Sequence, residues 1–406
     1  MGPSNVKLII LIATLSRLVP FLLLVILGRV SFPFDSSHQL VSIGTAPATL
    51  RWDAVHFTSI ALHGYEYEQQ IAFQPGWPAI MRLAAGSARW MSLEELGSQD
   101  LVMGGVVIAN LASIGASVML YKLTEQLTGQ SFALISALLF LLPPSPAALS
   151  SPYTEPTFAL LTFSGLHLAL RRHEMLGASC LAGATSIRAT GVFMAPVLGW
   201  IIAFGTPARV IDQSRLWKLL KAASAGLIVL GPFAAFQYYA YASFCHSSTT
   251  LRPWCNSRLP LVYSFVQGEY WNVGFLKYWT SAQIPNLLIV APVLAVSLIG
   301  TYRYLGGLLN PNETKKRPHD SLSMLPFHLH HLAMTFLLIF SSHTQIALRV
   351  ISGDPVVWWN LTALSFDWTN ANELRDMTSS GRAWMWWTVI WGAVSLVLWS
   401  GHYPPA

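Results

Sequence analysis

The sequence predicts an all-α membrane protein that crosses the bilayer many times. Of its 406 residues, 53% are hydrophobic and only 10% are charged, and the mean hydropathy is +0.48. Apolar runs near the length needed to cross a bilayer recur along the chain. A soluble α/β enzyme is a poor alternative for a chain of this composition.

The apolar runs give the candidate spans in order. They cover about residues 7–28, 101–123, 131–150, 156–171, 176–188, 191–205, 219–241, 283–304, 325–348 and 384–400. Some of them are too short or too rich in proline to be straight crossings. The first span begins almost at Met1, but it is long and no small-residue cleavage site follows it closely, so we interpret it as a retained signal-anchor.

The basic residues orient these spans. With the N-terminus in the cytosol, the densest basic clusters outside the spans fall on the cytosolic side, as the positive-inside rule expects. They are RRHE at 171–174, the stretch with Arg209, Arg215, Lys218 and Lys221, and the stretch with Lys315, Lys316 and Arg317. The far side then holds residues 29–100, 151–155, 189–190, 242–282 and 349–383.

The net charge of +6 requires no nucleic-acid partner. Basic residues cluster in loops that face anionic lipids, and no nucleic-acid-binding pattern occurs. We find no internal repeat and no low-complexity segment. The sequence therefore predicts one multi-pass membrane domain, 1–406, with two sizeable far-side loops, 29–100 and 242–282.

The first of these loops concentrates polar groups in the stretch RWDAVHFTSIA. If this stretch is helical, Asp53 and His56 are three residues apart and share a face. A partly desolvated carboxylate beside an arginine is a suitable general base for activating a hydroxyl group. The structural alternative is that Arg51 and Asp53 form an ion pair that orders the loop.

The polar run continues with His63, Glu66 and Glu68, which raises the question of a metal site. Carboxylate and imidazole ligands suit divalent cations, but HGYEYE has neither the HExxH spacing nor a DxD pair. Solvated loop residues are the favoured interpretation of both glutamates. The FQPGWP stretch that follows is a rigid turn whose Trp77 is either an interfacial anchor, which is the favoured role, or a platform for a sugar ring.

Two further polar signals fall on the same predicted side. SPYTEP places Glu155 just before an apolar run, where it either faces a cavity or caps the next helix. SIRATG interrupts two short apolar runs with Arg188. A planar guanidinium at a broken helix suits phosphate oxygens, and snorkelling to the interface is the alternative.

The cysteines and the glycosylation sequons also bear on topology. Cys245 and Cys255 are ten residues apart in a far-side loop, a spacing that a disulfide can close in an oxidising compartment. Thiol catalysis is disfavoured because no partner pattern accompanies them. Cys180 lies in an apolar run, where burial is expected. Of the sequons at Asn312 and Asn360, the predicted topology places only the second on the far side.

Several long stretches of the chain resemble the PIG-V family of GPI mannosyltransferases. They are RWDAVHFTSIALHGYEYEQQIAFQPGWP, SPYTE, IRATG, FQYYAYASFC, RPWC and PLVYSFVQGEYWNVGFLKYWTSAQIPNLLIVAPV. They occur in the family's order between about residues 50 and 300, and TQIALR (344–349) looks like the family's late QxxxR segment. Aromatic-rich blocks of this length are far more specific than a three-residue motif.

The resemblance implies a GT-C glycosyltransferase of the endoplasmic reticulum membrane. Such an enzyme transfers the second mannose, in α-1,6 linkage, from dolichyl phosphate mannose to the growing GPI precursor at the luminal face. The donor is β-linked and the product α-linked, so a single inverting displacement with a general base is expected, and Asp53 is the chosen base. Arg188 is the chosen phosphate ligand, ahead of Arg51, Arg252 and Arg258.

The resemblance also implies roles for neighbouring residues. His56 is the second catalytic candidate, and Trp52 and Glu155 are expected near the substrates. In EYWNVGF, the residues expected to line the site or a lipid groove are Tyr270, Trp271, Asn272 and Gly274, with packing as the alternative. No metal cofactor is expected for a lipid-linked donor. The expected partners are the two lipid substrates, membrane lipids and a small membrane-protein subunit.

Other functions remain as alternatives. A related dolichol-dependent mannosyltransferase would share fold and donor but lack the EYWNVGFLKY block. A transporter would place its polar residues deep within the spans, and a scaffold would tolerate the loss of Asp53. The chain also departs from the family pattern, with PGWP for PGFP, IRATG for an RxNG-type segment, and a short stretch between Cys245 and Cys255.

Overall fold

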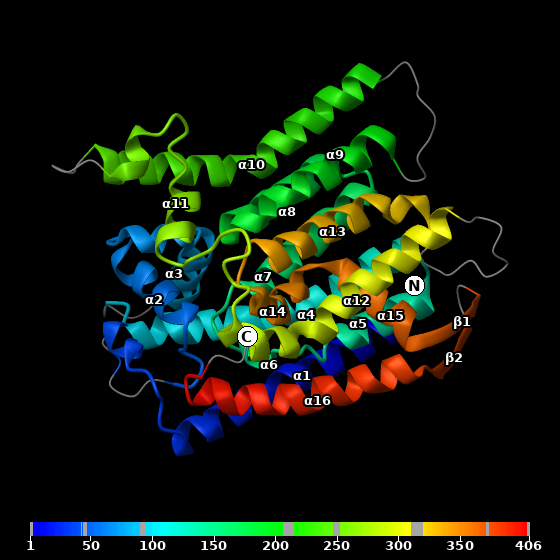
Figure 1. Ribbon diagram of the computed structural model, residues 1–406, viewed down its shortest axis with the longest axis horizontal. Helices are drawn as coiled ribbons and strands as arrows, with labels where there is room; N and C mark the ends of the chain where they lie inside the picture. Colours follow the sequence, from blue (N-terminus) through cyan, green and yellow to red (C-terminus); the bar gives the residue numbers. More distant parts are fainter. Residues whose placement is uncertain are drawn as a thin grey trace.

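The computed structural model describes residues 3–41, 43, 47–89, 95–205, 215–246, 252–309, 320–370 and 373–403. Its long helices lie roughly side by side and form the body of the molecule (Figure 1). Among the described residues, six helices are long and apolar enough to cross a membrane. They are Ser4–Val30, Ser98–Leu127, Leu216–Cys245, Ser281–Leu309, Leu322–Phe340 and Ser379–Ser400. The expected all-α multi-pass architecture is confirmed.

The elements follow one another in chain order. The helices are α1 (Pro3–Val30), α2 (Asp53–His63), α3 (Gly76–Ala88), α4 (Ser98–Leu127), α5 (Gln130–Phe140), α6 (Pro146–Ser150), α7 (Glu155–Leu170), α8 (Glu174–Ile187), α9 (Met194–Phe204), α10 (Arg215–Cys245), α11 (Val262–Glu269), α12 (Ile284–Leu309), α13 (Leu325–Phe340), α14 (Ala347–Val350), α15 (Pro355–Ser365) and α16 (Ser379–Ser400). Strands β1 (Phe366–Asn370) and β2 (Glu373–Met377) form an antiparallel hairpin.

Several predicted spans are shorter helices than a crossing requires. The segment 131–150 divides into α5 and α6 because Pro143 and Pro144 interrupt it. Segments 156–171 and 176–188 correspond to α7 and α8, which lie in the packed interior. Two glycines let these helices approach closely: a Cβ on Gly165 would lie 2.9 Å from the Gly177 carbonyl oxygen.

Two far-side loops gather at one end of the molecule. Figure 1 shows α2, α3 and α11 together there, at the end where α1 and α16 also finish. The end of α1 is joined to the end of α16, because the Phe34 amide donates to the Gly401 carbonyl at 2.8 Å. Cys245 and Cys255 form the expected disulfide, with their Cα atoms 5.7 Å apart. This end carries the cleft described below.

The stretch 349–383 does not lie wholly on that side, contrary to the predicted topology. After α14 the chain turns into α15, whose Trp359 indole donates to Thr124 Oγ1, near the end of α4, at 2.7 Å. The β1–β2 hairpin lies at the opposite end from α2 and α3 (Figure 1). Asn360 is fully buried and donates to the Ser297 carbonyl and to Thr301 Oγ1. It cannot accept a glycan there, and Asn312 lies outside the described residues.

Candidate active site

A cleft of about 680 Å³ opens among the far-side segments. Its walls combine charged, amide and aromatic side chains from distant parts of the sequence, among them Asp53, Phe57, Gln74, Thr154, Arg188, Trp271, Gly274 and Arg349. A volume of this size accommodates a sugar with parts of its substituents. The cleft is therefore the leading candidate for a substrate site.

Asp53 is the first residue of α2, and contacts with Tyr153 and Arg349 fix its position. Its backbone amide donates to the Tyr153 hydroxyl at 3.2 Å, and that hydroxyl donates to the Arg51 carbonyl at 3.0 Å. Its carboxylate pairs with Arg349 at 2.7 Å between Oδ2 and Nη1. The Asp53 side chain keeps 25% of its surface exposed, so its carboxylate is fixed and still reachable from the cleft.

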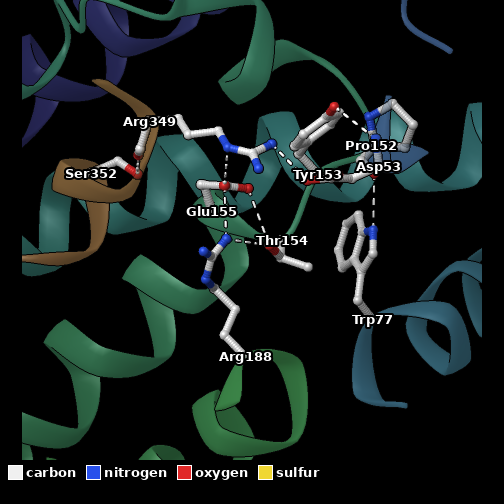
Figure 2. A network of polar contacts seen from close by, with 9 residues as sticks. All are labelled: Asp53, Trp77, Pro152, Tyr153, Thr154, Glu155, Arg188, Arg349 and Ser352. Atoms are coloured by element: carbon white, nitrogen blue, oxygen red, sulfur yellow. Dashed lines mark hydrogen bonds and ion pairs between the residues drawn. The ribbon is translucent and has the colours of Figure 1, made fainter. Parts of the chain in front are cut away.

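Glu155 joins the two arginines of the cleft. Figure 2 shows its carboxylate between the guanidinium groups of Arg349 and Arg188. Arg188 Nη1 lies 2.7 Å from Glu155 Oε1 and donates to Thr154 Oγ1 at 2.8 Å. Arg349 Nε lies 3.5 Å from the same Glu155 oxygen. A chain of alternating charges therefore runs from Asp53 through Arg349 and Glu155 to Arg188.

The charges in this chain stabilise one another. Burial alone would lower the pKa of Arg349, but the Asp53 and Glu155 carboxylates outweigh it and raise that pKa, so the guanidinium stays charged. Its carbon lies 5.3 Å from the centre of the Tyr153 ring, a cation–π distance. Burial raises the pKa of Tyr153 well above its usual value, so the hydroxyl stays neutral and can donate.

His56 lies one turn after Asp53, as predicted, but it faces aromatic rings. Its imidazole stacks on Phe73 at 5.1 Å and meets Trp271 edge-on at 5.8 Å. Burial lowers its pKa, and Asp53 offsets part of this effect. His56 does not line the cleft. It is a neutral side chain that supports the cleft wall rather than a group in contact with substrate.

Trp271 lines the cleft, as expected, whereas Asn272 does not. The Trp271 carbonyl contacts His343 Nε2 at 2.8 Å, and its indole Nε1 is buried without a hydrogen-bond partner among the described residues. Asn272 has φ +50°, which turns the chain sharply and leaves this side chain exposed to solvent. Its assignment to substrate binding is therefore corrected.

The assignments of Arg51 and Trp52 to substrate binding are also corrected, because both side chains make contacts that hold the loop in place. Arg51 is 1% exposed and donates to the carbonyls of Pro47, Leu50 and Ser400. It pairs with carbonyl groups, so the suggested ion pair with Asp53 is not formed. Trp52 has φ +52°, a strained value for this residue, and packs edge-on against His402 at 4.9 Å. Neither side chain lines the cleft.

The polar run after α2 differs from its predicted solvated state. Glu68 is 5% exposed and accepts hydrogen bonds from the Trp254 indole and the Tyr270 hydroxyl, each at 2.6 Å. Arg252 pairs with it at 2.9 Å, so Arg252 acts in this loop contact instead of in the cleft. Glu66 is exposed, as predicted for a solvated loop residue, and Arg258 is exposed as well.

Trp77 is an interior anchor and not an interfacial one. Its side chain is fully buried and its indole donates to the Pro152 carbonyl at 3.0 Å (Figure 2).

Within the described residues, no group of three or more His, Cys, Asp and Glu side chains is arranged to hold a metal ion.

Three residues of the site were not identified from the sequence. Tyr153 lies in SPYTEP and Gln74 in FQPGWP, two stretches singled out for other residues. Arg349 ends TQIALR, which resembles a late family segment but does not by itself indicate a role for the arginine. These three family segments are the available signal, since SPYTEP, FQPGWP and TQIALR contribute Thr154, Gln74 and Arg349 to the same cleft.

The solved structures similar to this chain include an archaeal oligosaccharyltransferase. The fold matches the Archaeoglobus fulgidus oligosaccharyltransferase in its complex with zinc and sulfate, with a TM-score of 0.51 and 14% sequence identity. The match covers 98% of this chain and 53% of that one, so this chain spans about half the length of the archaeal enzyme. The GT-C fold implied by the family resemblance is confirmed.

Sequence comparisons identify the family. The chain is 43% identical, over 99% of its length and 99% of the relative's, to GPI mannosyltransferase 2 of Cryptococcus neoformans. It is 32% identical to GPI alpha-1,6-mannosyltransferase 2 of Cricetulus griseus, over 80% of this chain and 74% of that one. The family model described as Mannosyltransferase (PIG-V) matches residues 6–406. With the fold, the cleft and the sequence in agreement, this chain belongs to the PIG-V family of mannosyltransferases.

Proposed function

We propose that this chain transfers a mannosyl residue, in α-1,6 linkage, from dolichyl phosphate mannose to a GPI precursor that already carries one mannose. The observation that supports this most directly is the pairing of Asp53 with Arg349 in a cleft that also holds Arg188. One carboxylate and two guanidinium groups are the parts that glycosyl transfer from a phosphate donor requires.

Asp53 acts as the general base of this reaction. The 6-hydroxyl oxygen of the acceptor mannose attacks C1 of the donor, the bond between C1 and the phosphate oxygen breaks, and the hydroxyl proton passes to the Asp53 carboxylate. Attack opposite the leaving group inverts the β-linked donor to an α-linked product. The exposed quarter of the Asp53 side chain leaves its carboxylate room to approach the acceptor.

Arg188 and Arg349 stabilise the leaving phosphate. Dolichyl phosphate departs as an anion, so it requires charge stabilisation and no general acid. Glu155 holds both guanidinium groups at one place, with Arg188 18% exposed and Arg349 13% exposed. Because these cations supply the compensating charge, we propose that the reaction needs no divalent metal.

The site lies at the luminal face of the endoplasmic reticulum membrane. Both substrates are lipids whose sugars lie at the membrane surface, and the catalytic groups occupy ends of elements: Asp53 begins α2, Glu155 begins α7 and Arg188 follows α8. A transporter would hold such groups near the middle of its spans. A small membrane-protein subunit is a further proposed partner.

The test is mannose transfer in membranes that contain the wild-type chain, Asp53→Asn or Asp367→Asn, expressed at equal levels. Asp367 is exposed on the distant hairpin and serves as the matched control. We expect Asp53→Asn to lower kcat by about 10²–10⁴-fold and the control to match wild type. If Asp53→Asn stays active and Glu155→Gln does not, Glu155 is the base. If the wild-type chain makes no two-mannose product, the proposed function is wrong.

A further inference from the structure

Gln74 is a buried amide that lines the cleft without a hydrogen-bond partner. It lies in the turn before α3 and is only 2% exposed. Neither Nε2 nor Oε1 has a partner among the described residues, although the residue forms part of the cleft wall. A buried polar group whose hydrogen bonds are not formed costs about 1–3 kcal/mol, so its presence in a folded protein requires an explanation.

The glutamine four residues earlier shows that this segment can satisfy an equally buried amide. Gln70 is 3% exposed. Its Oε1 accepts hydrogen bonds from the Glu66 and Tyr67 amides at 2.9 and 3.0 Å, and its Nε2 donates to Ser59 Oγ at 3.3 Å. All of the partners of Gln70 lie in the loop itself or in α2. Gln74 therefore lacks hydrogen-bond partners among the described residues because of where it lies, at the cleft wall.

The backbone on both sides of Gln74 is held by contacts, so the turn keeps the Gln74 side chain at the cleft. On one side, the Phe73 carbonyl accepts from the Tyr65 hydroxyl at 2.8 Å. On the other, Gly76 packs so closely on α8 that an added Cβ would lie 2.6 Å from the Ser186 carbonyl oxygen. The neighbouring Trp77 is tied to Pro152. The turn is thus held between the segments that carry Asp53, Thr154 and Arg188.

Gln74 lines the same cleft as Asp53 and Arg188. If Asp53 accepts the proton and Arg188 holds the phosphate, the mannosyl ring occupies the cleft between them. A primary amide offers a donor and an acceptor in one plane, which matches two neighbouring hydroxyl groups of a hexose. The unpaired indole N–H of Trp271 and the rings of Phe57 and Phe73 line the same cleft and suit the rest of a sugar ring.

We infer that the Gln74 amide binds hydroxyl groups of the donor hexose and sets the enzyme's selectivity for that sugar. This inference rests on the proposed function, because it takes the donor to be a lipid-linked hexosyl phosphate. The hexose hydroxyls would supply the hydrogen-bond partners that Gln74 lacks among the described residues. A site built in this way rejects an analogue that lacks the matching hydroxyl, because the amide then stays unpaired.

The test combines Gln74→Leu with donors that lack single hydroxyls. Transfer from dolichyl phosphate mannose and from its 2-, 3-, 4- and 6-deoxy analogues is measured for wild type, Gln74→Leu and Gln70→Leu. We expect wild type to discriminate against at least one deoxy donor by about 10²-fold or more in kcat/KM. Gln74→Leu should lose most of that discrimination by slowing the mannose donor, while Gln70→Leu should keep it.

Thermal melting separates recognition from folding. Replacing an unsatisfied buried amide by leucine should leave the apparent Tm unchanged or raise it, whereas Gln70→Leu should lower it. Gln74→Met, of similar length, repeats the measurement if the leucine variant does not fold. Unchanged discrimination in the Gln74 variants overturns the inference, as does a uniform loss with all donors and a lowered Tm. If wild type transfers no mannose at all, the proposed function fails, and the assigned ligand fails with it.

Discussion

Two carboxylate clusters occupy the same end of this molecule, and they are built differently. In the cleft, Asp53 and Glu155 face two arginines; the side chains of Asp53, Arg188 and Arg349 stay partly accessible, whereas Glu155 is buried. In the loops beside it, Glu68 alone accepts from Trp254 and Tyr270 and pairs with Arg252. The Glu68 cluster lies next to the Cys245–Cys255 disulfide and does not line the cleft.

The difference shows that a buried charge can either take part in a reaction, as proposed for the cleft cluster, or stabilise the fold, as in the Glu68 cluster. Both donors to Glu68 come from the second far-side loop and lie at short distances, so this cluster joins that loop to the first one. In the cleft, Arg349 Nε lies 3.5 Å from Glu155, longer than a normal hydrogen bond. Arg188 and Arg349 line the cleft and Arg252 does not, so the cleft arginines are the ones placed to meet a phosphate that enters it. The cleft cluster is therefore suited to ligand exchange and the Glu68 cluster to permanent contact.

The largest effect is expected when an arginine is removed from each cluster in turn. Arg349→Met should lower kcat by about 10²–10³-fold, because it removes a group that stabilises the leaving phosphate and positions Asp53. Arg252→Met should change kcat less than about tenfold, because its ion pair is partly exposed, at 36% for the arginine side chain. The measurement is mannose transfer at equal expression.

Arg349→Lys serves as the control for charge alone. It keeps the cation but not the planar pair of donors, so partial recovery of kcat is expected. Equal losses of activity in Arg349→Met and Arg252→Met would contradict the contrast between the clusters. So would a loss in Arg349→Met that is explained entirely by a lower amount of folded protein.

An intermediate effect, on stability, is expected at Glu68. Glu68→Gln keeps the shape but removes the charge from an acceptor of two short hydrogen bonds, which should cost about 1–3 kcal/mol. The apparent Tm in detergent should fall by several degrees while mannose transfer at low temperature changes less than about tenfold. Glu66→Gln, two residues away and exposed, should leave the Tm unchanged. Full stability with abolished transfer would instead place Glu68 in the reaction.

The features that sequence predicts well here are local ones. Long apolar runs predict α1, α4, α10, α12 and α16, because a bilayer requires a helix of that length whatever its neighbours are. The three-residue spacing of Asp53 and His56 predicts that they lie one turn apart on α2. The disulfide follows from two cysteines in one loop and an oxidising compartment.

The features that sequence misses depend on contacts between distant segments. Arg51 is two residues from Asp53, yet its guanidinium binds the Ser400 carbonyl at the other end of the chain. Arg349 is nearly three hundred residues from Asp53 and is its actual partner. Glu68 looks like part of a solvated charge run, but Trp254 and Tyr270 cover it. No local pattern encodes which charge meets which, because tertiary packing decides it.

The smallest predicted effect concerns His56, which lies between the two clusters. It follows Asp53 by one turn and packs against Trp271, the neighbour of Tyr270 in the Glu68 cluster. Burial lowers the pKa of His56 in the folded protein, so the unfolded chain binds a proton more readily. The free energy of unfolding should therefore fall as the pH drops below about 6.5, the usual pKa of histidine, and recover as the pH rises again. His56→Phe keeps the ring stacking and removes the proton site, so its apparent Tm should depend less on pH between 5.5 and 7.5 than that of wild type. His63→Phe, which alters an exposed histidine at the end of the same helix, is the control and should retain the wild-type profile. An identical pH profile in wild type and His56→Phe would mean that protonation of His56 does not contribute to the loss of stability at low pH.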